Sequence, residues 1–168
     1  MSETEACFSC GALVAPSDGP AHPYMRSSPG CWAAFGELQA AEMARFGYPE
    51  IHGMLVDCYA ASHGGGGAER RDRQSVFIHL MAICARVERG MDGPARIALL
   101  QRLTAQKRDW PVIWPPARMP AVDHTHLRGT SDAAEYERRA WEWAGAVWEA
   151  YGPVQDEIRC ALDQAFET

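Results

Sequence analysis

The sequence predicts an all-α protein, a helical bundle of about five to six helices with an irregular zinc-binding segment at its N-terminus. Two observations predict this class. Apolar residues recur at helical spacing in several segments that glycine or proline bounds, and no stretch of the 168 residues sustains the apolar–polar alternation of a half-buried strand. This length is enough for a substantial buried core, so we treat residues 1–168 as a single domain.

Residues 1–30 are rich in glycine, proline, serine and cysteine and lack periodicity, which predicts an irregular segment. The following part, residues 31–106, is expected to be helical. Its first helix starts near Pro29 and stops at Gly47, where Pro49 follows. The four helices expected here cover residues 29–47, 50–62, 73–90 and 93–106.

The third of these helices has the clearest pattern. Its apolar residues recur at the spacing i, i+4, i+7, i+8, i+11, which puts them on one face of a helix that packs on a core. Gly90 closes the segment. The residues of this apolar stripe are Val76, Leu80, Ile83, Cys84 and Val87.

The last third of the chain combines a long loop with two helices. Residues 107–130 contain four prolines and predict a loop, and long loops inside compact domains often carry function. Asp132 and Glu135 have the spacing of a capping box, which predicts the start of a helix. Gly152 and Pro153 interrupt the helical pattern, so residues 131–168 are expected to form two helices.

Composition and charge exclude several classes of protein. Hydrophobic residues make up 47% of the chain and charged residues 23%, as in a folded globular protein. The formal net charge of −6 argues against nucleic acid or an anionic membrane as a partner, because both need a basic surface. No apolar run approaches a membrane span, and residues 1–12 lack the features of a signal peptide. We therefore expect a cytoplasmic protein.

Cysteine and histidine gather near the N-terminus. Cys7 and Cys10 form a Cys-x-x-Cys pair followed by Gly11, as in a zinc knuckle, and Cys31 is the natural third ligand. His22 lies between them in a proline-framed loop, which gives the spacing C-x2-C-x11-H-x8-C. We predict that these four side chains bind zinc.

Alternatives to this metal site stay open. The Cys-x-x-Cys pair can be a redox pair or two unligated thiols, although no strand precedes it as in thioredoxin-like proteins. The fourth ligand can be another histidine or water, and thiolate sites also accept iron. The other cysteines, Cys58, Cys84 and Cys160, lie among apolar residues and are expected in the core.

A second group of polar residues falls on the expected second and third helices. His79 lies close to the apolar stripe of its helix, and an inward histidine needs a hydrogen-bonding partner or a metal. Asp57 is the nearest candidate partner, and His63 joins them if the second helix ends before it. These three residues are the candidate catalytic set, and a core histidine paired with aspartate is the alternative.

Two further motifs are expected to be structural. His124 and His126 can share one face of an extended loop and chelate a metal, but loop histidines are commonly exposed. The tryptophans of the fifth helix, Trp141, Trp143 and Trp148, are expected to form core and packing surface rather than a ligand cage.

Several of these motifs together resemble a family of uncharacterised bacterial proteins, a domain of unknown function, over nearly the whole chain. The chain departs from the family pattern at Ser62 and Gly64, where the family has glutamine and proline. The resemblance implies that the cysteines, Asp57, His63 and His79 belong to a set of residues common to the family. It implies no activity. The residues that carry it are Cys7–Ala12, Gly19–His22, Ser28–Trp32, Val56–Tyr59, His63–Gly64, Gln74–Val76, His79–Leu80, Trp143–Ala144 and Val147–Trp148.

Two functions follow from these patterns. The first is a zinc-binding protein with an Asp/His pocket for metal- or histidine-assisted chemistry on a small molecule. In it His63 is a general base or metal ligand, Asp57 orients it, and His79 is a ligand or electrostatic stabiliser. The second is a zinc-stabilised adaptor that docks a protein partner through exposed tryptophans, with Trp110, Trp114 and Trp141 as candidates. The sequence sets no oligomeric state.

Overall fold

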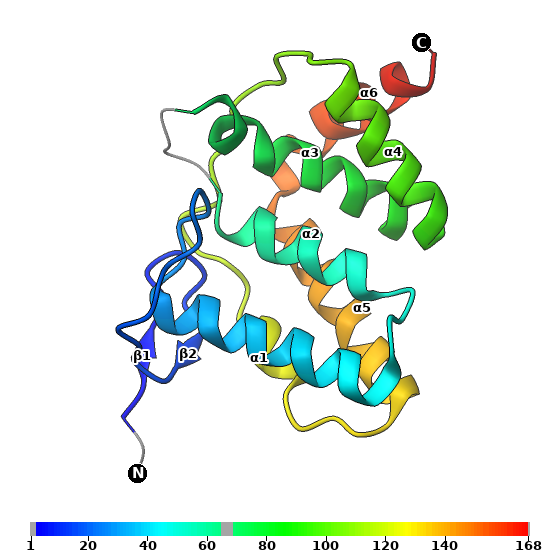
Figure 1. The fold of residues 1–168 in the computed structure, drawn as a ribbon. Helices are drawn as coiled ribbons and strands as arrows, with labels where there is room; N and C mark the ends of the chain where they lie inside the picture. Colours follow the sequence, from blue (N-terminus) through cyan, green and yellow to red (C-terminus); the bar gives the residue numbers. More distant parts are fainter. Residues whose placement is uncertain (1–2, 65–68, 168) are drawn as a thin grey trace.

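The computed structural model describes residues 3–64 and 69–167, which form a stack of helices with an irregular segment on one side (Figure 1). Two very short strands, β1 (Glu5–Ala6) and β2 (Leu13–Val14), pair antiparallel in the N-terminal segment. The helices are α1 (Pro29–Phe46), α2 (His52–Ser62), α3 (Arg70–Val87), α4 (Gly93–Ala105), α5 (Ala133–Ala150) and α6 (Gln155–Glu167), with 3₁₀ turns η1 (His124–Leu127) and η2 (Gly152–Val154).

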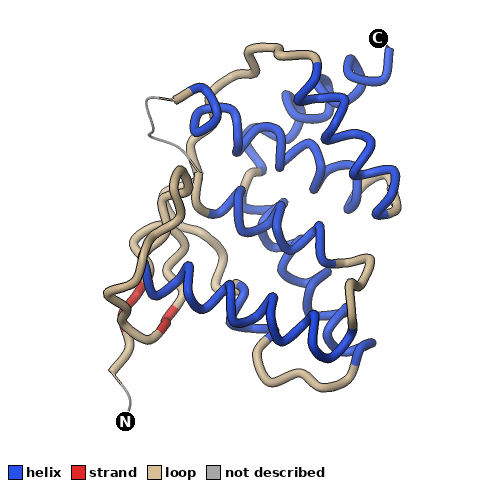
Figure 2. The backbone as a smooth tube through the Cα atoms, viewed as in Figure 1, coloured by secondary structure: helices blue, strands red, loops and turns tan. Residues whose placement is uncertain are grey.

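The predicted all-α class is confirmed. Helices account for most of the described chain, and the only strands in that part are β1 and β2 (Figure 2). The four helices expected before residue 107 form within a few residues of their predicted bounds, as do the two after residue 131. Periodicity located a helix such as α5 because it buries one apolar face. Helix α2 differs, because its residues are buried on nearly every side.

Side chains at the helix ends explain where several helices begin. Ser28 caps α1, its hydroxyl accepting a hydrogen bond from the backbone N–H of Cys31 at 3.2 Å. The carboxylate of Asp132 accepts from the N–H of Glu135 at 2.8 Å and starts α5 as predicted. Each cap satisfies a backbone donor that the first helical turn leaves unpaired.

The core lies where α2 and α3 pack against each other and against α5 and α6. Four residues of the predicted apolar stripe of α3 are fully buried and the fifth, Val87, packs at its edge. Trp143 and Trp148 of α5 are buried as predicted, whereas Trp141 is only partly buried. Among the helices of the described chain, none has the length and apolar character that crossing a membrane requires.

Gln74 of α3 binds the backbone of the proline-rich loop through two hydrogen bonds. The side-chain amide of Gln74 donates to the carbonyl of Trp110 at 2.8 Å and accepts from its N–H at 2.6 Å. The Trp110 ring stacks on Phe77, with 5.4 Å between centroids. Trp110 is therefore buried and the expectation that it is exposed is wrong, while Trp114 further along the loop is 57% exposed.

One cysteine departs from the expected core. Cys58 and Cys84 are fully buried, as predicted, but Cys160 is exposed on α6. The pattern of α6 explains the difference, because its buried face carries Ile158, Leu162 and Ala165, and Cys160 lies on another side of the helix.

Candidate metal centre

Four side chains with metal-binding atoms meet at the junction of the N-terminal segment, α1 and α2. They are Cys7, Cys10, Cys31 and His63, all buried, and their ligand atoms all lie within 4.8 Å of one another. The Sγ atoms of Cys10 and Cys31 are 3.8 Å apart. Nε2 of His63 lies 3.7 Å from Sγ of Cys7 and 3.4 Å from Sγ of Cys31. This Cys3His cluster can hold a metal ion.

A tight turn presents the first two cysteines. The N–H of Gly11 donates to the carbonyl of Cys7 at 2.8 Å, and the N–H of Cys7 donates to the carbonyl of Ala12 at 2.9 Å. Gly11 has a φ of +79°, a conformation that glycine adopts without the penalty of a side chain. The turn thus folds Cys10 back beside Cys7.

Helix α1 supplies the third cysteine. Cys31 lies in its first turn. A hydrogen bond with Cys10 lowers the pKa of its thiol, but contact with Cys7 and burial outweigh it and raise that pKa to about 12. The hydroxyl of Tyr59 donates to Sγ of Cys31 over 3.6 Å. The third sulfur is therefore held by a helix end and by a residue of α2.

The histidine of the cluster follows directly after α2. Nδ1 of His63 lies 2.7 Å from the carbonyl oxygen of Tyr59. Because a carbonyl only accepts, Nδ1 carries the proton and Nε2 presents a lone pair to the cysteines, the form that binds a metal. The backbone carbonyl of His63 also accepts from the N–H of Arg26 at 2.6 Å, which ties α2 to the N-terminal segment.

The sulfurs of the cluster do not ionise equally. Hydrogen bonds from Cys10 and Cys31 hold the pKa of the Cys7 thiol far below its ordinary value. Contact with Cys31 and Cys7, together with burial, raises the pKa of the Cys10 thiol. Negative charge gathered on buried sulfur favours the entry of a cation.

The structure does not bring His22 into this cluster. His63 is the histidine beside the three cysteines, in the position that was predicted for His22. Nδ1 of His22 accepts from the N–H groups of Tyr24 at 3.3 Å and Met25 at 3.0 Å. Its ring packs edge-on against Tyr24 and Trp32. His22 shapes the loop before α1. Its position between the cysteines in the sequence does not determine how far its side chain lies from them in space.

The three candidate catalytic residues separate into two places. His63 belongs to the Cys3His cluster, whereas Nδ1 of His79 lies 2.7 Å from Oδ1 of Asp57. Arg96 of α4, which the sequence analysis did not single out, binds the same carboxylate through Nε and, at 2.5 Å, through Nη2. Arg96 lies on the buried face of α4 together with Leu99 and Leu103. Because a buried arginine needs a counter-charge, this position could have indicated a buried acidic partner.

The two loop histidines do not form a chelating pair. Nε2 of His126 contacts Glu142 at 3.0 Å on the surface of α5. His124 is fully buried, and neither ring nitrogen has a hydrogen-bond partner among the described residues. Burial lowers the pKa of His124 to about 4, so its ring stays neutral near pH 7.

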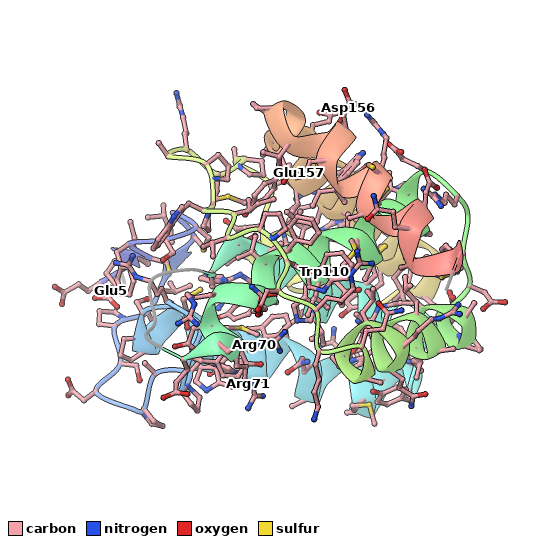
Figure 3. All side chains as sticks on the ribbon, turned by 90° about the horizontal axis from the view of Figure 1, so that it is seen from above. Glu5, Arg70, Arg71, Trp110, Asp156 and Glu157 are labelled. Carbon is pink, nitrogen blue, oxygen red and sulfur yellow. The ribbon has the colours of Figure 1, made fainter. Side chains whose placement is uncertain are left out.

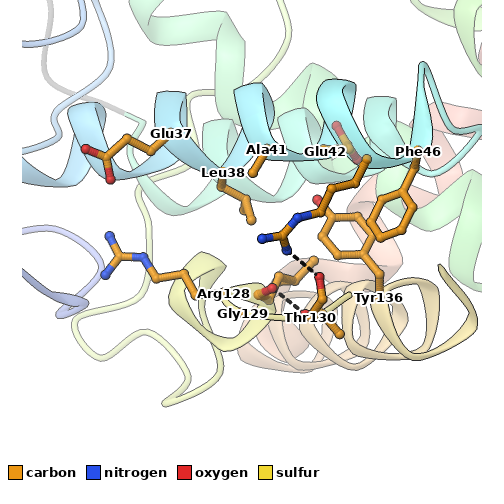
Figure 4. A pocket seen from close by; sticks show the side chains of 11 residues that line it. Glu37, Leu38, Ala41, Glu42, Phe46, Arg128, Gly129, Thr130 and Tyr136 are labelled. Carbon is orange, nitrogen blue, oxygen red and sulfur yellow. Dashed lines mark hydrogen bonds between the residues drawn. The ribbon is translucent and has the colours of Figure 1, made fainter. Parts of the chain in front are cut away.

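A small hollow of about 170 Å³ lies between α1 and the chain from η1 to α5 (Figure 4). The guanidinium of Arg45 reaches across it and donates to the backbone carbonyl of Thr130 at 2.7 Å. The Thr130 hydroxyl in turn donates to the carbonyl of Leu127. These contacts join α1 to the loop, so we interpret this hollow as structural.

The fold and the cluster define a class: small helical proteins whose irregular N-terminal segment carries a buried Cys3His set able to hold a metal ion. The chain belongs to the family of unknown function DUF5946, whose model matches residues 5–152. The matched range contains all four cluster residues as well as Asp57 and His79. No curated protein and no solved structure matches the chain.

Proposed function

We propose that Cys7, Cys10, Cys31 and His63 bind one zinc ion. In a tetrahedral site with zinc–sulfur bonds of about 2.3 Å and zinc–nitrogen bonds of about 2.0–2.1 Å, neighbouring donor atoms stand about 3.5–3.8 Å apart. The three separations given above, 3.4 to 3.8 Å, are close to these edges. This agreement of spacing with donor chemistry is the observation that carries the proposal.

The proposed role of the ion is structural. A site with four protein donors leaves no open position for a substrate, and all four donors are buried. The donors come from the N-terminal turn, the start of α1 and the end of α2. An ion held by all of them stabilises the irregular segment on the bundle and adds its binding free energy to that of folding. Reduced thiols suit a cytoplasmic protein.

We also propose that His79 takes part in chemistry on a small molecule. Asp57 is fully buried, whereas the imidazole side chain of His79 keeps 17% of its surface exposed and lines a pocket between α3 and α4. Asp57 fixes the ring through Nδ1, so Nε2 is the nitrogen available as a general base. His63 has no part in this chemistry, because its Nε2 faces the cysteines.

A second candidate function is the zinc-stabilised adaptor. Phe8 and Leu13, both in the segment that the ion would hold, are 67% and 64% exposed. Large apolar side chains on a surface that a metal fixes are a feature of docking modules. Trp114 is the only one of the three predicted docking tryptophans that is exposed.

Metal analysis tests the first part. Untagged protein, purified without chelator, should contain one zinc per chain by elemental analysis, and Cys10→Ser should lose it. His63→Ala should weaken zinc retention in competition with a chromogenic chelator, while His22→Ala and His79→Ala should retain zinc as the wild type does. Wild-type protein without metal would overturn the proposal, and loss of zinc in His22→Ala but not in His63→Ala would overturn the ligand assignment.

A further inference from the structure

The pocket beside His79 has the size of a small-molecule site. It lies between α3 and α4 and has a volume of about 380 Å³, within the roughly 300–1,000 Å³ usual for such sites. Ile78, Leu100 and Leu103 give it apolar walls, and Tyr24 of the N-terminal segment borders it. A ligand with an apolar part therefore finds contacts here.

The charge of this pocket is opposite to that of the chain. Arg70, Arg71 and Arg108 line it and no acidic residue of the described chain does, although the formal net charge of the protein is −6. Figure 3 shows Arg70 and Arg71 next to each other at the start of α3. A concentration of cationic groups in a concave site raises the local concentration of anions.

The three arginines differ in the groups that they contact. Arg70 binds Asp109 at 2.9 Å. Arg108 stands over the ring of Trp110, 4.6 Å from the ring centroid, and donates to the side-chain oxygen of Gln164 at 3.3 Å. Arg71 stands over the ring of Tyr24, with 4.0 Å from its guanidinium carbon to the ring centroid, and no carboxylate in the described part of the chain pairs with it. Arg71 thus keeps its hydrogen-bond donors for a ligand.

Two polar side chains one turn apart on α3, Ser75 and His79, also line this pocket. Ser75 is only 8% exposed, and its hydroxyl has no hydrogen-bond partner among the described residues. A buried hydroxyl without a partner costs free energy that a bound ligand can recover. His79, four residues later on the same helix face, presents Nε2, because Nδ1 donates to Asp57.

We propose that this pocket binds a small organic oxyanion, a carboxylate or a phosphate monoester. Arg71 binds the oxyanion, Ser75 and His79 form hydrogen bonds with it, and the apolar part of the ligand packs on Leu100 and Leu103. The inference names the ligand class of the small-molecule pocket and so rests on that part of the proposed function. It is independent of the zinc ion.

Binding of three probes of similar shape tests the charge requirement. Phenyl phosphate, benzoate and the neutral benzyl alcohol are titrated into the full-length protein by calorimetry. At least one anion should bind about tenfold or more tighter than the alcohol, which corresponds to about 1.4 kcal/mol. The tighter anion identifies the oxyanion as phosphate or carboxylate. Equal affinity for all three probes, or no binding of any, overturns the proposal.

Variants then test the location. Arg71→Gln should weaken binding of the tighter anion about tenfold, and Ser75→Ala about threefold, since one charge-assisted and one neutral hydrogen bond are lost. Arg138→Gln, which removes the same charge from the exposed face of α5, is the matched control and should bind as the wild type does. Equal weakening by Arg71→Gln and Arg138→Gln would show diffuse attraction and overturn the site.

One further readout keeps the test valid if Arg71→Gln folds poorly. The ring proton resonances of His79 in the wild-type protein, assigned with His79→Gln, should shift on addition of the anion, and those of His126 should not. Metal content is measured on the same samples. If the anion binds but is not chemically converted, only the proposed chemistry at His79 is contradicted. If it binds to wild-type protein that contains no zinc as purified, only the zinc site is contradicted.

Discussion

Nδ1 of His79 lies 2.7 Å from Oδ1 of Asp57, and Arg96 binds the same carboxylate from α4. Asp57 is fully buried and Arg96 nearly so. One acidic residue of α2 therefore joins α3 and α4 through two side chains. The arrangement stabilises the helix stack and also orients a histidine at a pocket.

Asp57→Asn is expected to destabilise the protein by about 3–5 kcal/mol, because it leaves the charge of Arg96 buried without a counter-charge. Urea denaturation followed by circular dichroism measures this loss. His79→Ala is the matched comparison, since it keeps the Asp57–Arg96 pair and should cost only about 1–3 kcal/mol. If the two variants were equally stable, the Asp57–Arg96 ion pair would not be the main contribution of Asp57 to the stability of the fold.

Gly53→Ala should also destabilise the protein, although alanine favours a helix by about 1 kcal/mol over glycine. A Cβ atom at Gly53 would stand 2.8 Å from Cζ of Arg96, so the guanidinium would have to leave Asp57. Gly145→Ala on α5 is the control, because a Cβ there meets nothing within 4 Å. Thermal unfolding should show a lower midpoint for the first variant and an equal or higher one for the second.

Loss of the metal is expected to loosen one end of the molecule. In Cys10→Ser, hydrogen exchange should speed up in residues 5–31, which the cluster ties to α2, while α3 keeps its protection as part of the core. In the wild-type protein, a chelator should lower the midpoint of thermal unfolding and added zinc should restore it. Unchanged exchange in residues 5–31 would contradict the structural role.

The contact between α3 and α6 predicts a dependence on pH. Hydrogen bonds from Arg159 hold the pKa of Glu88 at about 2, below its ordinary value of 4.5. Because the folded-state pKa is the lower one, the contribution of Glu88 to stability is present above about pH 4.5 and is lost as the pH falls toward 2.

Glu88→Gln tests this dependence. The wild type should be more stable than the variant above pH 4.5, by less than about 1 kcal/mol because both partners are partly exposed. The difference should shrink toward pH 2, while the bond from Nε1 of Trp148 to the side chain at position 88 is retained. Denaturant midpoints at several pH values measure it, and a difference that grows on acidification would contradict the assignment.

The helices were predictable because the information for each of them is local. The apolar stripe of α3 and the cap at Asp132 follow from spacing along one helix. The same holds for the cysteines, because Cys7 and Cys10 lie in one turn and Cys31 follows the cap of the next helix. The pairing of His79 with Asp57 was also foreseen, as the core alternative to a catalytic role.

What the sequence by itself determined was thus the set of helices and the three cysteines of the cluster. The tertiary structure alone decided which histidine completes the cluster, since His63 reaches it only because α2 ends beside the start of α1, whereas His22 turns back on its own loop. It alone revealed Arg96 behind Asp57 and an unpaired Ser75 in a cationic pocket. These relationships join residues far apart in the chain, and their distances depend on how the helices pack rather than on residue spacing.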